Sequence, residues 1–161
     1  MKLDQRLTNV SVIGAAGKMG SGIALLMAHE MYLQKMNPQN ADQSFRLNLI
    51  DLDEQALDGL IEYLRTQSVK KGEKSIVMLR DLYADRSDLV ENGEIIQQYV
   101  DEVMAIIRTG TDMKIVEKSH LVFEAIVENI DIKIELFKKL NKICAKDTFF
   151  FTNTSSIPIH L

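Results

Sequence analysis

Residues 10–27 read VSVIGAAGKMGSGIALLM, and their pattern indicates the fold class. It begins as a short apolar strand, passes through glycines, and continues without a helix breaker as an apolar run that reaches Met36. A strand, a glycine-rich turn and a long buried helix in succession are typical of the first unit of a parallel sheet. The chain that follows should therefore alternate strands and helices.

Later apolar runs are expected to be strands of the same sheet: FRLNLIDLD from residue 45, HLVFEAIVEN from residue 120 and TFFFTN from residue 148. Helical patterns separate them, starting at residues 53 and 131. The order predicts an α/β protein with a Rossmann-type doubly wound parallel sheet and right-handed crossovers. We expect the run from residue 120 to end with Glu128 and Asn129, and Phe149, Phe150 and Phe151 to lie in a strand covered on both faces.

Residues 73–108 do not belong to this minimal pattern. They are helical and charged, with a break at ENGE (91–94), an amphipathic helix IIQQYVDEVMAII, and a closing polar turn RTGTD (108–112). We interpret them as a helical excursion from the sheet. The helical insertion after the second strand then spans about residues 53–108 in all.

Composition limits the function classes. With 161 residues, 46% hydrophobic and 26% charged, the chain is long enough for one domain with a real core. The net charge of −4 argues against a nucleic-acid or anionic-membrane partner. A lone cysteine, Cys144, and an N-terminus without an apolar stretch favour a cytoplasmic protein. The sequence stops at SSIPIHL, where a new element should begin, so we expect a fragment of a longer protein.

The glycines of GAAGKMG suit a phosphate-binding turn. Gly14 permits a tight turn, Gly17 removes a Cβ where a pyrophosphate approaches, and Gly20 lets the helix lie close to the strand. The helix start, with Lys18 and Met19, offers free N–H groups and a positive partial charge of roughly half a unit. A simple tight turn is the alternative, and the spacing departs by one residue from G-x-G-x-x-G, which leaves open which glycine lies nearest the phosphate.

Asp51 closes the second strand, where a carboxylate can accept hydrogen bonds from both ribose hydroxyls of an adenosine. It would repel a 2′-phosphate, so it favours NAD over NADP. Asp51 lies 31 residues after Gly20, beyond the usual offset of about 20, and the polar loop NPQNADQS accounts for the excess. Asp53 competes for this role, but a helix N-cap explains it adequately.

Taken together, VIGAAGKMGSGIA, LIDLD, VFEAIVENIDIKIELFKKL and TNTSSIPI resemble the NAD-binding domain of the L-3-hydroxyacyl-CoA dehydrogenases, which include 3-hydroxybutyryl-CoA enzymes and enzymes of fatty-acid β-oxidation. The resemblance covers the first strand and helix, the second strand and nearly all of residues 109–161. EAIVEN and NTSS are more specific than the glycines, whereas residues 32–45 and 73–108 match poorly.

The resemblance implies roles for particular residues. Glu128 lies beside the nicotinamide ribose, and Lys133 approaches cofactor or substrate. Asn153 lies near the nicotinamide and substrate, and Ser155 is the active-site serine that hydrogen-bonds the substrate 3-oxygen. A hydroxyl suits this place because it orients the oxygen without competing as a base. The implied partner is an acyl-CoA, and no metal site is implied.

The resemblance also shows what the chain lacks. The family's catalytic His–Glu pair lies in a later G-x-H-F-F-N-P-like strand and beyond, and its helical C-terminal domain forms the dimer. His160 comes too early to replace the catalytic histidine, and His29 and His120 are better explained as structural or surface residues. We therefore expect the 161-residue chain to bind NAD without turnover.

Other interpretations remain open at this point. GAAGKMG also resembles the fingerprint of dihydrodipicolinate reductase, although EAIVEN and NTSS oppose that interpretation. A non-catalytic, crystallin-like relative is a further alternative. In the insertion, Lys70, Lys71 and Lys74 either meet CoA phosphates or form a solvated helix end.

Overall fold

A computed structural model describes residues 1–153 of the chain. The elements follow in the order α1 (Leu3–Arg6), β1 (Asn9–Ile13), α2 (Lys18–Met36), η1 (Pro38–Asn40), β2 (Arg46–Ile50), α3 (Glu54–Lys74), α4 (Ile76–Leu82), α5 (Asn92–Ala105), β3 (Ile107–Gly110), η2 (Met113–Lys118), β4 (Leu121–Glu124), α6 (Ile130–Ile143) and β5 (Phe149–Thr152).

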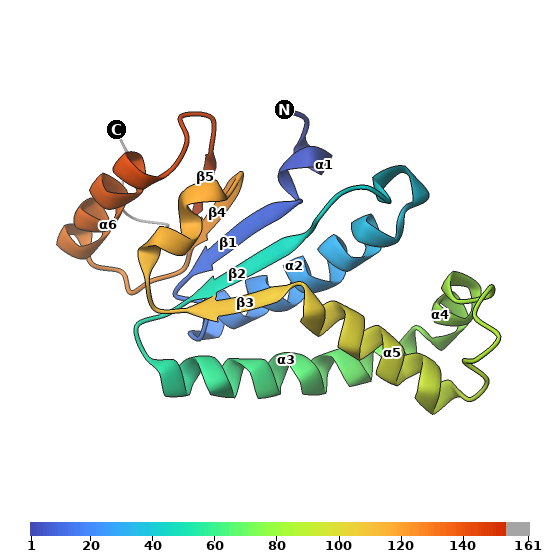
Figure 1. The fold of residues 1–161 in the computed structure, drawn as a ribbon. Helices are drawn as coiled ribbons and strands as arrows, with labels where there is room; N and C mark the ends of the chain where they lie inside the picture. Colours follow the sequence, from blue (N-terminus) through green and yellow to red (C-terminus); the bar gives the residue numbers. More distant parts are fainter. Residues whose placement is uncertain (154–161) are drawn as a thin grey trace.

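The strands form one parallel sheet in the order β3-β2-β1-β4-β5 (Figure 1). The chain moves outward from β1 to one edge, returns across the sheet, and then fills the other side. This is the doubly wound arrangement expected from the sequence, and it confirms the predicted Rossmann-type fold. A crevice for ligands is expected at the carboxyl ends of the strands, where the winding reverses beside β1.

Alternating side chains of the central strands supply two cores. Val10 and Val12 of β1 point to the face covered by α2, α3 and α5. Ile13 points to the opposite face, where it packs with Phe137 and Leu140 of α6. On that face Ser11 also lies buried, and its hydroxyl is 2.5 Å from that of Ser119, so even the polar position is satisfied. Burial on both faces explains the strongly apolar character of β1.

The first three residues of RTGTD, a segment expected to be a polar turn, instead lie in an edge strand. Residues Ile107–Gly110 form β3, which pairs in parallel with β2, and Leu47 lies opposite Ile107. The prediction was wrong because this edge strand pairs with one strand only and buries a single residue, Ile107, which leaves the rest of the segment polar. Arg108 and Thr109 are exposed, so their polarity is compatible with a strand.

Two further expectations about strands need correction. The strand from residue 120 ends at Glu124 rather than at Glu128, because the last ladder bond joins Ala125 N to Ile13 O at 2.9 Å and the chain then turns away. The aromatic strand β5 is an edge strand of the described sheet, and it is not covered on both faces. Phe149 and Phe151 are 48% and 47% exposed.

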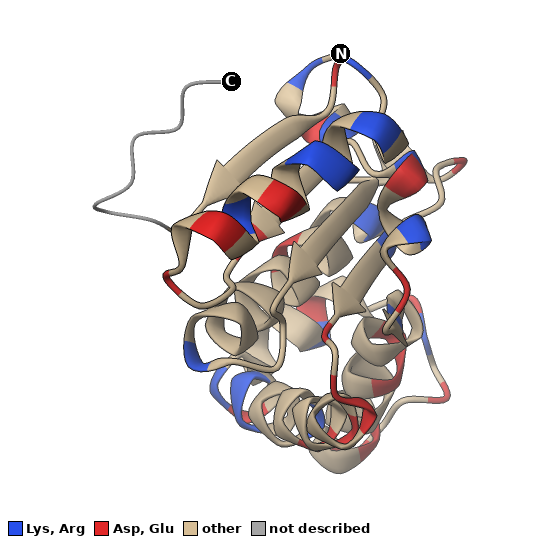
Figure 2. Ribbon diagram, turned by 90° about the vertical axis from the view of Figure 1, so that its left-hand side faces the viewer, with Lys and Arg blue, Asp and Glu red and all other residues tan. Residues whose placement is uncertain are grey.

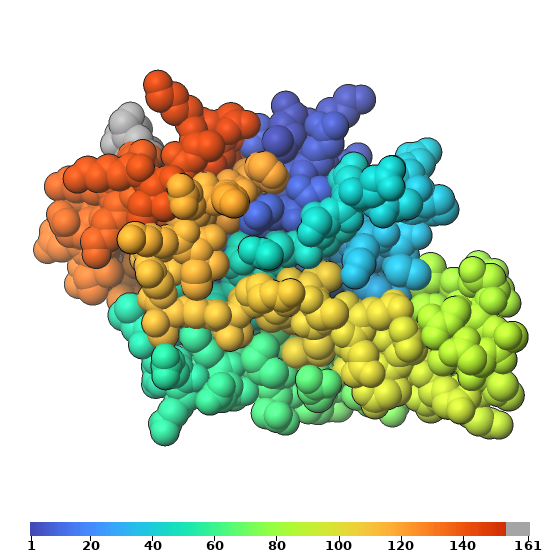
Figure 3. Space-filling view, viewed as in Figure 1, coloured from blue at the N-terminus to red at the C-terminus, as the bar shows by residue number. Residues whose placement is uncertain are grey.

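The insertion is helical, as predicted, but it does not stand apart from the sheet throughout. Val100, Val103 and Ile106 of the segment 92–106 belong to the main core, so α5 is part of the layer that covers the sheet. The part that projects is α4 together with the loop up to residue 91, which forms the green lobe of Figures 1 and 3.

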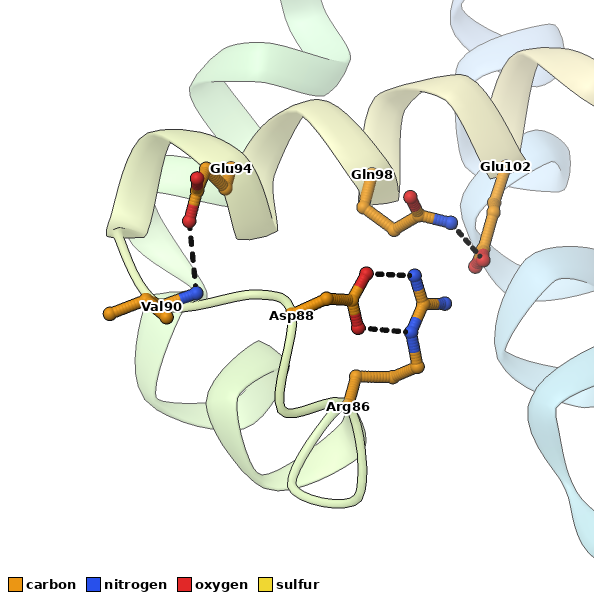
Figure 4. Close-up of polar contacts among 6 residues, drawn as sticks. All are labelled: Arg86, Asp88, Val90, Glu94, Gln98 and Glu102. Carbon is orange, nitrogen blue, oxygen red and sulfur yellow. Dashed lines mark hydrogen bonds and ion pairs between the residues drawn. The ribbon is translucent and has the colours of Figure 1, made fainter.

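Short polar contacts order the projecting loop (Figure 4). Arg86 donates two hydrogen bonds to Asp88, each 2.9 Å long, and the pair is exposed to solvent. Glu94 accepts from the backbone N–H of Val90 at 2.9 Å, which ties the loop to the first turn of α5. The predicted break at ENGE is therefore the capped start of α5.

Candidate functional site

Within residues 1–153, the predicted site residues lie at or near one edge of the sheet, where the strands end. In the register, Ile13 lies opposite both Ile50 and Glu124, and Glu124 lies opposite Thr152. The segments that follow β1, β2, β4 and β5 therefore start side by side. Figure 2 views the molecule from the side toward which the strand arrows of Figure 1 point, and there Lys and Arg residues are interspersed with Asp and Glu residues.

Two of the three glycines are required by the chain's own packing. Gly14 has φ +75°, and a Cβ on it would lie 2.7 Å from the carbonyl oxygen of Ala125. A Cβ on Gly20 would lie 2.0 Å from the carbonyl oxygen of Gly14. The glycine turn is thus pressed against both the start of α2 and the loop after β4.

Gly17 has no such internal reason to be a glycine. Its φ is −73°, it is exposed, and a Cβ there would make an ordinary contact 3.4 Å from Gly14 O. It is the N-cap of α2, no side chain caps that helix, and its first turn holds no acidic residue. Lys18 and Met19 are exposed beside it. The result is an open, positively polarised helix start that can hold an anion.

Asp51 is held against this turn by two backbone amides. Its Oδ2 accepts a hydrogen bond from Ala16 N at 3.1 Å, and its Oδ1 accepts from Leu52 N at 2.8 Å. An ionised carboxylate has about four lone-pair positions, so the group can still accept bonds from two hydroxyls. Asp53, the competitor, accepts from the backbone N–H groups of Gln55 and Ala56 and is confirmed as the N-cap of α3.

Glu128 and Asn129 lie in the loop between β4 and α6. Glu128 is exposed. Asn129 is the N-cap of α6, since its side-chain oxygen accepts from Ile132 N at 3.2 Å. The same loop begins at Ala125, which touches Gly14, so the loop adjoins the glycine turn even though the strand ends earlier than expected.

Lys133 is buried, whereas a ligand-binding lysine at the surface would be exposed. Its side chain is 4% exposed, and its Nζ lies 3.2 Å from Oε1 of Glu124, whose side chain is 1% exposed. The other carboxylate oxygen of Glu124 accepts from the hydroxyl of Thr152 at 2.6 Å. Glu124 was not among the site residues expected from the sequence. Its position at a strand end, nine residues before a lysine in the next helix, was the available signal.

Asn153 follows β5 directly. Its backbone N–H donates to the carbonyl of Glu124 at 2.9 Å, and its side chain is exposed at the same edge. Ser155 and His160 lie outside the described residues.

The remaining histidines lie away from this edge. The Nδ1 of His29 contacts the hydroxyl of Tyr99 beneath α5, where burial, aided by the charge of Lys71, lowers the pKa of His29 to about 4. His120 lies at the amino-terminal end of β4. A hollow near it is lined by Asn9 and Ser119, and another lies beside Tyr83 of the insertion, so neither hollow belongs to the carboxyl edge.

Comparison with known proteins agrees with this geometry. The family described as "3-hydroxyacyl-CoA dehydrogenase, NAD binding domain" matches residues 9–161. The chain belongs to this family. NAD is the cofactor that the family indicates. The fingerprint shared with dihydrodipicolinate reductase is therefore confined to the glycine turn, and the alternative based on it is set aside.

Individual relatives support the assignment. The chain is 33% identical over 152 residues to human mitochondrial hydroxyacyl-coenzyme A dehydrogenase, and 28% identical over 148 residues to a probable 3-hydroxybutyryl-CoA dehydrogenase of Bacillus subtilis. These matches cover 94% and 92% of this chain but 40% and 41% of the relatives. The chain thus spans about two-fifths of their length.

A solved structure is similar as well. The 3-hydroxybutyryl-CoA dehydrogenase of Escherichia coli matches with a TM-score of 0.62 and 25% identity, over 93% of this chain and 25% of that one. Within residues 1–153, no His, Cys, Asp and Glu side chains gather as a metal site would require. None of the described helices has the length and apolarity needed to cross a membrane.

Proposed function

We propose that this chain is the N-terminal dinucleotide-binding domain, residues 1–161 with the insertion at about 53–108, of an NAD-dependent 3-hydroxyacyl-CoA dehydrogenase. The full-length protein interconverts L-3-hydroxyacyl-CoA and 3-oxoacyl-CoA in fatty-acid or related acyl-CoA metabolism. The observation that carries the proposal is the convergence of Gly17, Asp51, Lys133 and Asn153 on one sheet edge, in a chain that belongs to this family.

The chemistry of that edge supports one position for the cofactor. Asp51, at the end of β2, accepts hydrogen bonds from the adenosine ribose. The pyrophosphate lies over Gly17 and the N–H groups of Lys18, Met19 and Gly20 at the start of α2. Because β4 lies on the other side of β1 from β2, the nicotinamide half extends toward β4 and β5. Glu128, Lys133 and Asn153 lie on that side.

The reaction removes a hydride from C3 of the substrate and a proton from its 3-hydroxyl. NAD⁺, when bound, supplies the hydride acceptor. Ser155 orients the 3-oxygen by a hydrogen bond, and Asn153 helps to hold nicotinamide and substrate together. Fixed donors at a developing charge typically lower a barrier by about 2.7–4 kcal/mol.

The proton acceptor is expected in a segment other than this chain, as a histidine oriented by a glutamate. The same longer protein would carry the helical domain that forms a homodimer and encloses the acyl chain. We place the protein in the cytoplasm, since the free thiol of Cys144 suits a reducing compartment.

A turnover assay tests the proposal. NADH oxidation with acetoacetyl-CoA is measured for the full-length protein, for its Ser155→Ala variant, and for the 161-residue chain alone. We expect turnover by the full-length protein, a kcat/KM at least about a hundredfold lower for Ser155→Ala, and none by the chain alone. Failure of the full-length protein to oxidise NADH would favour a non-catalytic relative. An unaffected Ser155→Ala variant would remove Ser155 from the active site.

A further inference from the structure

The carboxyl ends of β4 and β5 enclose a charged cluster formed by Glu124, Lys133 and Thr152. Lys133 Nζ lies 3.2 Å from Glu124 Oε1, and the Thr152 hydroxyl donates to Glu124 Oε2 at 2.6 Å. Both charged side chains are at least nine-tenths buried. The cluster links the end of β4, the first turn of α6 and the end of β5.

Stability alone does not account for this arrangement. A buried ion pair is usually no more stabilising than apolar side chains of the same size, because both ions lose their hydration. Lys133 is also placed badly for a structural cation. It lies in the first turn of α6, where the helix dipole disfavours positive charge.

The ammonium group has donors to spare. An ammonium carries three N–H groups, and within residues 1–153 Lys133 Nζ makes the ion pair with Glu124 but no hydrogen bond of regular geometry. A buried donor without an acceptor destabilises a folded protein. A site that leaves such donors unused at a ligand-binding edge is suited to an oxygen-rich ligand.

The location of the pair in the sheet indicates which half of a bound dinucleotide would reach Lys133. β1 lies between β2 and β4 in the sheet. Asp51, after β2, therefore lies on one side of β1, and the Glu124–Lys133 pair lies on the other side. A dinucleotide that places its adenosine at Asp51 and its pyrophosphate at Gly17 carries its second nucleoside toward Lys133. The ribose hydroxyls and amide oxygen of that nucleoside are acceptors for an ammonium.

We propose that Glu124 is a positioning residue for cofactor binding. Its carboxylate, fixed by the hydroxyl of Thr152, holds the Lys133 ammonium in place so that its remaining donors meet oxygen atoms on the nicotinamide half of NAD. The inference rests on the proposed placement of NAD at this edge. In this arrangement Lys133 contacts the nicotinamide half of NAD and not the adenosine half, and Glu124 itself does not touch the cofactor.

Two ligands separate the halves of the cofactor. ADP contains the adenosine and the pyrophosphate but lacks the nicotinamide nucleoside, so Glu124 should matter for NADH and not for ADP. We expect Glu124→Gln to weaken NADH binding about tenfold and to leave ADP binding within about twofold of wild type, as measured by calorimetry. Glu135→Gln on the same helix, where Glu135 pairs with the exposed Lys138, is the matched control and should change neither affinity.

Further variants identify the route of the effect. Thr152→Val should weaken NADH binding, and Thr152→Ser, which keeps the hydroxyl, should restore it. In a Lys133→Met background, Glu124→Gln should cause no additional loss of NADH affinity. This double variant buries no unpaired charge, so it also serves if Glu124→Gln alone does not fold.

The outcomes are distinct. Parallel loss of NADH and ADP affinity in Glu124→Gln would show a merely structural role and overturn the inference. Unchanged NADH affinity, or a full additional loss in the Lys133→Met background, would also overturn it. If the wild-type chain binds neither NADH nor ADP, the proposed function itself fails.

Discussion

Gly17 differs from Gly14 and Gly20 in that the packing of the chain does not require a glycine at this position, so a bound ligand is the proposed reason for it. Gly14 and Gly20 must be glycines because a Cβ would collide with backbone atoms at 2.7 and 2.0 Å, whereas Gly17 has room for a methyl group. The glycine spacing alone did not indicate which glycine lies nearest the phosphate, and this difference favours Gly17. The pyrophosphate is expected closest to Gly17, where the chain itself leaves the space.

Replacing Gly17 with alanine should therefore reduce binding far more than stability. We expect NADH affinity to fall at least about tenfold, because the methyl group occupies phosphate space, while loss of the glycine N-cap costs about 1 kcal/mol at most. Gly22→Ala is the control, since a Cβ there meets nothing within 4 Å. Calorimetry and thermal unfolding supply the two readouts, and wild-type affinity in Gly17→Ala would refute this phosphate position.

His29 should make stability depend on pH. Burial lowers the pKa of its imidazole from 6.5 to about 4, so the folded state favours the neutral form. Below pH 6.5 the unfolded chain binds a proton that the folded chain resists, and stability falls as the pH drops toward 4. Because the ring is partly exposed, we expect a loss of about 1–2 kcal/mol.

The measurement compares wild type with His29→Asn by urea denaturation between pH 7 and pH 4. The variant should lose less stability over this interval, since the titrating group is gone. Identical pH profiles for the two proteins would contradict the assignment.

Part of the candidate site could be predicted from the sequence alone. The positions of Asp51 and the glycines and the N-cap role of Asp53 were predictable, because they depend on local backbone geometry at strand and helix ends. Glu124 was not recognisable, because a glutamate that ends an apolar run is equally compatible with an exposed strand end. Its burial depends on Lys133 and Thr152, which reach it only once α6 and β5 have packed.

At the scale of elements, a polar clamp fastens the insertion to α2. The hydroxyls of Tyr32 and Tyr83 contact each other and donate to Oε2 of Glu102 at 2.6 and 2.8 Å. Gln98 donates to Oε1 at 2.7 Å. Burial alone would raise the pKa of Glu102, but these hydrogen bonds outweigh it and lower the pKa below its ordinary 4.5. The clamp joins α2, α5 and the residue after α4.

Removing one hydroxyl should loosen the clamp. Tyr83→Phe should lower the free energy of unfolding by about 1–2 kcal/mol, because a charged acceptor loses a buried donor. Tyr63→Phe, at a tyrosine that is 39% exposed on α3, should change it by less than about 0.5 kcal/mol. Urea denaturation measures both, and equal effects of the two substitutions would show that the clamp contributes nothing.

Edge strands were the elements that sequence patterns described least well. β3 was mistaken for a turn because one buried residue, Ile107, leaves no periodic signal. β5 was recognised as a strand, yet its aromatic residues suggested two covered faces. In the described structure Phe151 stacks on Phe123 with 5.2 Å between ring centroids while remaining half exposed.

At the scale of the whole molecule, the alternation of strands and helices was sufficient to predict the doubly wound sheet. The reason is that few topologies satisfy short right-handed crossovers with both sheet faces covered. The same reasoning predicted that the chain segments after β1, β2, β4 and β5 would share one edge. It did not predict the path of residues 73–108, since an amphipathic helix such as α5 can pack on the sheet or on another helix.

The proposed function requires NAD to bind at the edge formed by the glycine turn and Asp51. Calorimetric titration of the 161-residue chain with NADH and with NADPH is the decisive measurement. Because a carboxylate in the position of Asp51 can accept ribose hydroxyls and would repel a 2′-phosphate, we expect NADH to bind at least about tenfold more tightly than NADPH. Equal affinities, a preference for NADPH, or no binding of either cofactor would overturn the assignment of Asp51 to the ribose of NAD.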